Sequence, residues 1–81
     1  MYYVYILLCS DDTLYTGITN NLERRLKMHR TGTASNYTRA RKALKFVYTE
    51  RKRNKSCALK REAEIKRFTR TQKLELISSS S

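Results

Sequence analysis

The chain has few side chains that could hold a structural metal ion. It contains two cysteines and one histidine in 81 residues, and Cys9 and Cys57 do not have the spacing of metal ligands. A structural zinc site needs four Cys or His ligands, so that class of small fold is excluded. We expect both cysteines to be buried, reduced thiols.

Long apolar runs are also missing. No stretch approaches the ~18 apolar residues of a membrane-spanning helix. The first apolar stretch, residues 2–8, is too short for a signal peptide and lacks a preceding basic segment. We therefore expect a cytoplasmic protein with no membrane-embedded part.

Acidic residues are scarce: there are seven Asp and Glu against eighteen Lys and Arg, which gives a formal net charge of +11. Such an excess of positive charge causes strong electrostatic repulsion within a small domain unless an anionic partner neutralises it. The expected partner is nucleic acid, with DNA preferred and RNA as the alternative. An acidic membrane surface is a weaker candidate for the partner. Alternatively, the positive charge has no partner and only keeps the protein soluble.

The length allows one small domain, expected over residues 1–77, and a disordered serine tail at residues 78–81. Residues 3–8 are apolar at both alternating sets of positions, which predicts a strand covered on both faces. Turn residues 10–12 separate this strand from a second one at residues 14–18, so the two should form an antiparallel hairpin.

The length of the hairpin loop decides which tyrosines meet. A loop that pairs Cys9 with Thr13 would set Tyr5 opposite Gly17 and would turn Tyr5 and Tyr15 to the same face. A two-residue loop would turn these tyrosines to opposite faces. We predict the odd-length loop, in which the missing side chain of Gly17 leaves room for a phenol ring.

The rest of the chain predicts further helices and one more strand. A helix over residues 21–30, ended by Gly32, is followed by a basic loop at residues 33–42. The remaining predicted elements are a strand at residues 44–49, a charged turn at 51–55, a helix at 57–70 capped by Ser56, and a short helix at 71–77.

Charged side chains lie on the inward faces of these helices. The first helix turns Leu22, Arg25, Leu26 and His29 to one side, and the later helix turns inward Ala58, Leu59, Glu62, Ala63, Ile65 and Lys66. Buried charges need partners, so Glu62 could simply pair with Lys66 or with Arg25. Alternatively, Arg25, Glu62 and tyrosine hydroxyls together have the chemistry needed for metal-assisted phosphodiester cleavage.

Four segments, in this order and spacing, resemble the GIY-YIG nuclease superfamily. They are Tyr3-Val4-Tyr5, Tyr15-Thr16-Gly17, the run from Asn21 to Leu26, and the run from Ala58 to Glu62. The chain is most similar to the small, stand-alone, single-domain bacterial members. The resemblance implies an α+β fold of order β-β-α-β-α-(α), with a three-stranded antiparallel sheet flanked by helices.

The resemblance also implies the residues of a catalytic site and their roles. Mg²⁺ or Mn²⁺ would bind Glu62, while Arg25 would neutralise charge in the transition state. Tyr5 or Tyr15 would deprotonate the attacking water, for which the cationic surroundings should lower a phenol pKa. The implied catalytic set is Tyr5, Tyr15, Gly17, Arg25, His29 and Glu62.

The chain departs from the family pattern in its later half. Many active members have a further Asn after the glutamate helix, and no Asn follows Asn54 here. No second, DNA-binding domain is expected, so a protein partner could supply specificity. The predicted function is an endonuclease directed by nucleic-acid structure rather than sequence; the alternative is a non-catalytic, repair- or ribosome-associated nucleic-acid-binding module.

Basic residues beside the predicted site could neutralise phosphates, with steep salt dependence, and an aromatic ring could stack on a base. Each of them could equally be a solvated surface charge. The predicted nucleic-acid-binding residues are Tyr37, Arg39, Arg41, Lys42, Arg51, Lys52, Arg53 and Lys55.

Overall fold

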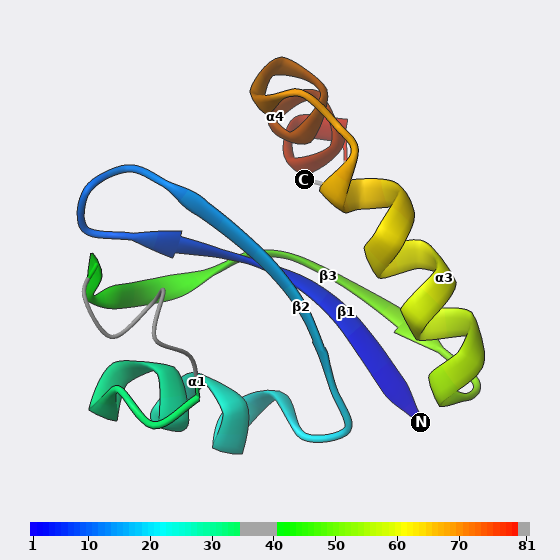
Figure 1. Cartoon of the computed structure of the whole chain (residues 1–81), viewed down its shortest axis with the longest axis horizontal. Coiled ribbons are helices and arrows are strands. Elements are labelled where there is room, and N and C mark those ends of the chain that lie inside the picture. Colours follow the sequence, from blue (N-terminus) through cyan, green and yellow to red (C-terminus); the bar gives the residue numbers. More distant parts are fainter. Residues whose placement is uncertain (35–40, 80–81) are drawn as a thin grey trace.

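The computed structural model describes residues 1–34 and 41–79, and the chain follows the order β-β-α-β-α-α through them (Figure 1). The elements are β1 (Tyr2–Cys9), β2 (Leu14–Thr19), α1 (Leu22–Thr31), β3 (Ala43–Lys52), α3 (Lys55–Lys66) and α4 (Arg70–Ser79). This α+β architecture confirms the predicted fold class. Within the described ranges, no helix has both the length and the apolar composition needed to cross a membrane.

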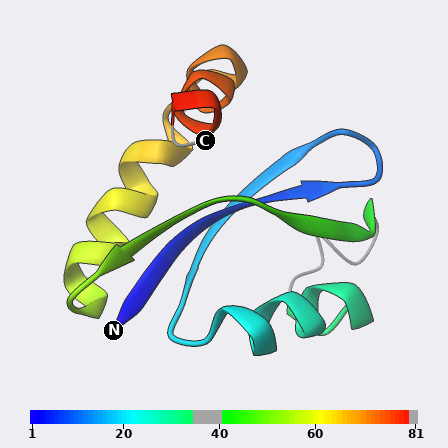
Figure 2. The ribbon, with the colours of Figure 1, turned by 180° about the vertical axis from the view of Figure 1, so that it is seen from behind.

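The three strands form one antiparallel sheet in the order β2-β1-β3, and helices cover both of its faces (Figures 1 and 2). Alternate residues of the central strand, β1, pack on opposite faces of the sheet. Val4 and Ile6 pack with Ala58 and Ile65 of α3. Tyr5 and the other residues of its layer pack toward α1. Both faces of β1 are thus buried, as its continuous apolar character predicts.

The hairpin has the predicted odd-length loop. Cys9 donates its backbone N–H to the Thr13 carbonyl at 3.0 Å, and the pairing then sets Tyr5 opposite Gly17. Leu7 faces Tyr15 in the same register. This register turns Tyr5 and Tyr15 to one face of the sheet, where α1 lies.

Helix α1 is held at both ends by the residues that the sequence indicates. The Asn21 side chain accepts the Arg24 N–H at 3.0 Å, which makes Asn21 the N-cap. Gly32 ends the helix in the left-handed region, with φ of 80°. His29 is buried and Arg25 is half-buried on the inward face, which confirms the predicted orientation of the helix.

In the second half of the chain, the predicted end of the third strand and the predicted cap of the following helix are wrong. β3 continues through Lys52 because Lys52 pairs with Tyr2, so the charged turn is shorter than residues 51–55. Asn54, rather than Ser56, caps α3 by accepting the Cys57 N–H at 2.9 Å.

The helix predicted over residues 57–70 ends earlier, at Lys66, and the last helix, predicted at residues 71–77, begins at Arg70 with Thr69 as its N-cap. The Thr69 hydroxyl accepts the Gln72 N–H at 3.1 Å, and the Gln72 side chain accepts the Thr69 N–H at 2.8 Å. This reciprocal pair is a capping box, which fixes the beginning of α4. α4 then runs through Ser79 and so includes two of the four serines expected in the tail; residues 80–81 lie outside the described residues.

Helix α3 is rotated relative to its predicted inward face. Ala58 and Ile65 are buried as predicted, but Leu59 is 45 % exposed, and Ala63 and Lys66 are also exposed. Cys57 is half-buried, which corrects the prediction that both thiols are buried; Cys9 is buried. Arg61, predicted to face outward, is half-buried instead.

The half-buried Arg61 of α3 binds the Glu50 carboxylate of β3. The carboxylate accepts the Arg61 Nε–H at 3.1 and 3.2 Å, the Tyr48 hydroxyl, and an ion pair from Lys52 Nζ at 2.6 Å. Burial raises the Glu50 pKa, but the hydrogen bonds from Lys52 and Tyr48 and the Arg61 charge outweigh it and hold the pKa below its ordinary value. Glu50 therefore fastens the middle of α3 to the edge strand.

Replacing Glu50 by alanine is expected to lower the free energy of unfolding by about 2–3 kcal/mol, because three half-buried donors lose their shared acceptor. Urea unfolding at pH 7 measures this loss. The matched control is Glu64→Ala on α3: its carboxylate is 59 % exposed and also bonds Arg61, so the expected loss is below about 1 kcal/mol. Equal losses in the two variants would refute the anchoring role.

Candidate active site

Tyr5 lies in the middle of the sheet with its ring across Gly17. The residue is 2 % exposed. A Cβ atom at position 17 would lie 2.5 Å from the Tyr5 hydroxyl oxygen and 2.7 Å from Cζ. No side chain larger than hydrogen fits beneath the ring, so Gly17 makes the space that the phenol occupies.

Tyr5, Tyr15 and His29 form one cluster between the sheet and α1. The Tyr5 and Tyr15 ring centroids are 6.5 Å apart, and the His29 ring lies 5.7 Å from Tyr5 and 5.3 Å from Tyr15. The Tyr5 hydroxyl and His29 Nε2 are 2.7 Å apart and share a buried hydrogen bond. Phe46 of β3 packs against the Tyr5 ring at 5.0 Å and fixes its position.

The protonation states of this pair differ from the expected ones. Burial raises the pKa of Tyr5, the nearby Tyr15 adds to the rise, and the Arg25 charge opposes it without reversing it. The predicted lowering of a phenol pKa is therefore wrong for Tyr5. Burial, followed by the Arg25 charge, lowers the pKa of His29. At pH 7 Tyr5 is a neutral phenol beside a neutral imidazole.

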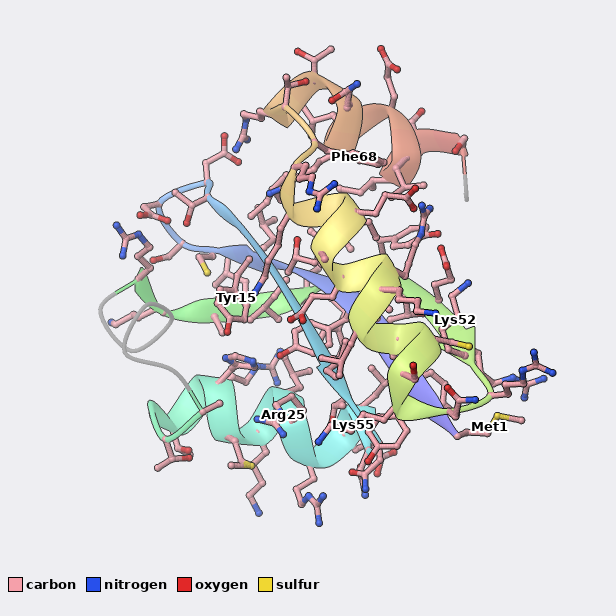
Figure 3. The ribbon with its side chains drawn as sticks, turned by 45° about the vertical axis from the view of Figure 1, so that its right-hand side comes forward. Met1, Tyr15, Arg25, Lys52, Lys55 and Phe68 are labelled. Carbon is pink, nitrogen blue, oxygen red and sulfur yellow. The ribbon has the colours of Figure 1, made fainter. Side chains whose placement is uncertain are left out.

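Arg25 and Glu62 bring opposite charges to the cluster from different helices. Arg25 is half-buried, and its Nε lies 3.5 Å from the Thr19 hydroxyl oxygen. The charges of both Arg25 and Glu62 act on the Tyr5 hydroxyl, since Glu62 also contributes to its raised pKa. Figure 3 shows Arg25 and Tyr15 on the same side of α3.

The Glu62 carboxylate pairs locally rather than with Arg25. Its side chain is 18 % exposed, and Lys66 Nζ lies 3.3 Å from Oε2. Within residues 1–34 and 41–79, no ion pair joins Arg25 to Glu62. Of the two structural pairings that the sequence left open, the structure contains the one with Lys66.

A divalent ion fits this carboxylate. No cluster of three or more His, Cys, Asp or Glu side chains that could hold a metal ion exists in the described part of the chain, so an ion at Glu62 would need water or substrate oxygens as further ligands. Mg²⁺ keeps several waters and binds through one or two carboxylates and substrate phosphates. Lys66 is 54 % exposed and can move aside, which leaves a largely shielded carboxylate available to a cation.

A hollow of about 360 Å³ lies beside Arg25, and we call it the inner hollow. Thr19 lines it and also fixes the beginning of α1: its hydroxyl oxygen accepts the Asn21 N–H at 3.1 Å. The lining residues are Tyr2, Ile18, Thr19, Asn20, Arg24, Arg25 and Lys55. Thr19 and Arg24 line this hollow and Phe46 packs against Tyr5, and the sequence analysis named none of the three as a candidate site residue.

The predicted nucleic-acid-binding residues fall into separate groups. Arg41 and Lys42 lie at the hairpin end of the sheet, where Arg41 Nε is 3.2 Å from Asp11 and Ser10 donates to both their carbonyls. The group from Arg51 to Lys55 lies at the other end of β3, about 30 Å away along a ten-residue strand. Tyr37 and Arg39 lie outside the described residues.

The lowered pKa of His29 predicts a stability that depends on pH. The unfolded chain binds a proton at His29 more readily than the native state does, so acidification from pH 7.5 to 5.5 should favour unfolding. The charged and titratable groups around His29 are Tyr5 from β1, Tyr15 from β2 and Arg25 from α1.

Urea unfolding of wild type and His29→Gln between pH 7.5 and 5.5 measures this effect. Glutamine can still accept the Tyr5 hydrogen bond but does not titrate, so its unfolding free energy should fall less over this range. A decline as steep in His29→Gln as in wild type would show that other groups cause it.

Comparison with known proteins identifies a family to which this chain is similar. The family model described as the GIY-YIG catalytic domain matches residues 1–75. A UPF0213 protein of Clostridium perfringens is 57 % identical over 81 residues, covering 100 % of this chain and 87 % of that protein. A UPF0213 protein of Natronomonas pharaonis is 48 % identical over 77 residues, covering 95 % and 91 %.

A solved structure gives the same result for the fold. The solution NMR structure of a UPF0213 protein from Bacillus halodurans is 40 % identical to this chain, with a TM-score of 0.61. The match covers 96 % of this chain and 84 % of that one. With the family model spanning nearly all of its residues, this chain belongs to the GIY-YIG family of nuclease-type catalytic domains.

Proposed function

We propose that this protein is a metal-dependent endonuclease that hydrolyses phosphodiester bonds in DNA, with RNA as the alternative substrate, and that it selects substrates by structure rather than sequence. The observation that carries the proposal is the buried Tyr5–His29 hydrogen bond, set where the charges of Arg25 and Glu62 both act. Hydrolysis of a phosphodiester needs a proton acceptor, a cation for the phosphate and a metal ligand. These residues supply all three.

Arg25 is the residue that receives the phosphate. Its guanidinium borders the inner hollow, where Arg24 and Lys55 add positive charge. A half-buried guanidinium stabilises the extra negative charge of the transition state more than an exposed one would, because water screens it less. Thr19 keeps the side chain in place through its hydroxyl.

Glu62 would hold the divalent ion. When bound, Mg²⁺ or Mn²⁺ would supply a Lewis acid for the phosphate oxygens. The charge of this carboxylate acts on Tyr5 from α3, and Glu50 fastens α3 to the sheet through the neighbouring Arg61.

Tyr5 and His29 would act together on the attacking water. In the His29 tautomer with its proton on Nδ1, the Tyr5 hydroxyl donates to Nε2. As water attacks phosphorus, a new P–O bond forms and one water O–H bond breaks; the proton passes to the Tyr5 oxygen, while the Tyr5 proton passes to His29 Nε2. The P–O bond to the leaving oxygen breaks, and that oxygen takes up a proton from solvent. A relay of this kind needs no phenolate, so the raised pKa of Tyr5 is compatible with catalysis.

Cleavage assays with purified protein test the proposal. Labelled duplex, single-stranded and branched DNA, and RNA, are incubated with Mg²⁺, with Mn²⁺ and with EDTA. Internal cleavage products are expected with either metal and none with EDTA. Absence of metal-dependent products from every substrate would overturn the proposal.

A second candidate function is nucleic-acid binding without turnover. The observation that favours it is that no group of three or more His, Cys, Asp or Glu side chains in the described residues could hold a metal ion, because additional ligands would hold a metal more firmly. Binding without cleavage of any substrate in the same assays would support this alternative.

A further inference from the structure

A basic hollow among the described residues lies away from the tyrosine cluster. We call it the outer groove; its volume is about 520 Å³, and it runs between the end of β3 and α3. Five basic side chains line it: Arg51, Lys52, Arg53, Lys60 and Arg61. Tyr5, Tyr15, Arg25 and His29 come from β1, β2 and α1, whereas the outer groove is lined by the end of β3 and by α3.

Helix α3 separates the outer groove from the reaction centre. Figure 3 shows Lys52 on one side of α3 and Tyr15 and Arg25 on the other, with Lys55 between them at the beginning of the helix. Lys55 lines the inner hollow beside Arg25, while Cys57, two residues later, lines the outer groove. The two hollows therefore flank the first turn of α3.

Charges in the outer groove are only partly neutralised by the protein. Glu50 pairs with Lys52 and Arg61, and Glu64 pairs with Arg61. Among the ion pairs of residues 1–34 and 41–79, none uses Arg51, Arg53 or Lys60, and all three residues are exposed. A groove with unpaired cations on its rim attracts a polyanion rather than an apolar or cationic ligand.

We infer that the nucleic-acid backbone crosses the beginning of α3, so that phosphates beside the cleaved bond bind Arg53 and Lys60 in the outer groove while the cleaved phosphate binds Arg25. This inference rests on the proposed function and adds a second contact region to it. A helix is about 10–12 Å across, and a duplex advances about 3.4 Å per nucleotide. Contact with the substrate then extends at least about three nucleotides beyond the cut on one side.

Binding in EDTA tests the outer groove without any cleavage. The variant Arg53→Gln/Lys60→Gln removes two exposed charges from the groove, and Lys27→Gln/Lys45→Gln removes two exposed charges elsewhere. Fluorescence anisotropy with a labelled duplex should show about tenfold weaker binding for the groove variant at 0.15 M salt, with a salt slope reduced by about 1.5–2. The control variant should stay within about twofold of wild type.

Cleavage and footprinting complete the test. With Mg²⁺, the groove variant should show a raised KM and an unchanged kcat, because neither side chain touches the reacting atoms. Hydroxyl-radical protection should extend about three nucleotides beyond the cut in wild type and shrink in the groove variant. If the two double variants bind the duplex equally well, or if the footprint is unchanged, the outer groove is not a contact region for nucleic acid. A wild type that binds as described but never cuts overturns the proposed function alone.

Discussion

Replacing Glu62 by glutamine is expected to reduce cleavage about a thousandfold while leaving the fold intact. Glutamine has the shape of glutamate but no charge, so it binds a hard divalent ion poorly. The native structure loses only the ion pair with the exposed Lys66, worth less than about 0.5 kcal/mol. Single-turnover cleavage at saturating Mg²⁺ measures the rate, and thermal unfolding checks the fold.

Glu64→Gln is the matched control for this prediction, since it lies on the same helix with its side chain 59 % exposed. Its cleavage rate should remain within about twofold of wild type. If Glu62→Gln retained more than a tenth of the wild-type rate, Glu62 would not be the metal ligand. Raising the Mn²⁺ concentration should not restore the variant.

Replacing Gly17 by alanine is expected to impair both stability and cleavage. The added Cβ would lie 2.5 Å from the Tyr5 hydroxyl oxygen, and Phe46 on β3 restricts the ring's retreat. Such overpacking costs about 1–3 kcal/mol. Any movement of the ring also takes the hydroxyl away from His29 Nε2, now 2.7 Å distant. We expect a fall in kcat of about a hundredfold or more.

The chain's other glycine separates these two effects. Gly32→Ala places a Cβ at a φ of 80°, outside the active site, and should destabilise the protein by about 1 kcal/mol. Both variants are assayed below their melting temperatures, so that unfolding does not lower the rate. A loss of kcat no larger in Gly17→Ala than in Gly32→Ala would contradict the close packing of Tyr5 as a catalytic requirement.

Local patterns were sufficient to predict the first half of the site. The missing side chain of Gly17 makes space for the Tyr5 ring only if the two residues are paired across the hairpin. That pairing requires the odd-length loop. Asn21 and Gly32 mark the ends of α1, and helical periodicity alone turns Arg25 and His29 inward. Each of these conclusions depends on residues close together in sequence.

The second half of the site depends on contacts between different helices and strands, which the periodicity of one element does not predict. Apolar spacing predicts that Leu59 faces inward, but Leu59 is exposed, while Arg61 is half-buried and bonds Glu50 on the preceding strand. A register shift between β1 and β3 brings Phe46 opposite Leu7, and with it the packing partner of Tyr5. Burial is the main cause of the raised pKa of Tyr5. The excess of cationic residues in the sequence did not predict this burial.

A structure with Mn²⁺ and an uncleavable oligonucleotide would test the central claim, that residues from β1, β2, α1 and α3 form one hydrolytic site. The anomalous signal of manganese should lie against the Glu62 carboxylate, with the phosphate between the metal and Arg25 and a water near the Tyr5 hydroxyl. Manganese bound elsewhere, or a phosphate that contacts neither Arg25 nor the metal, would contradict the account.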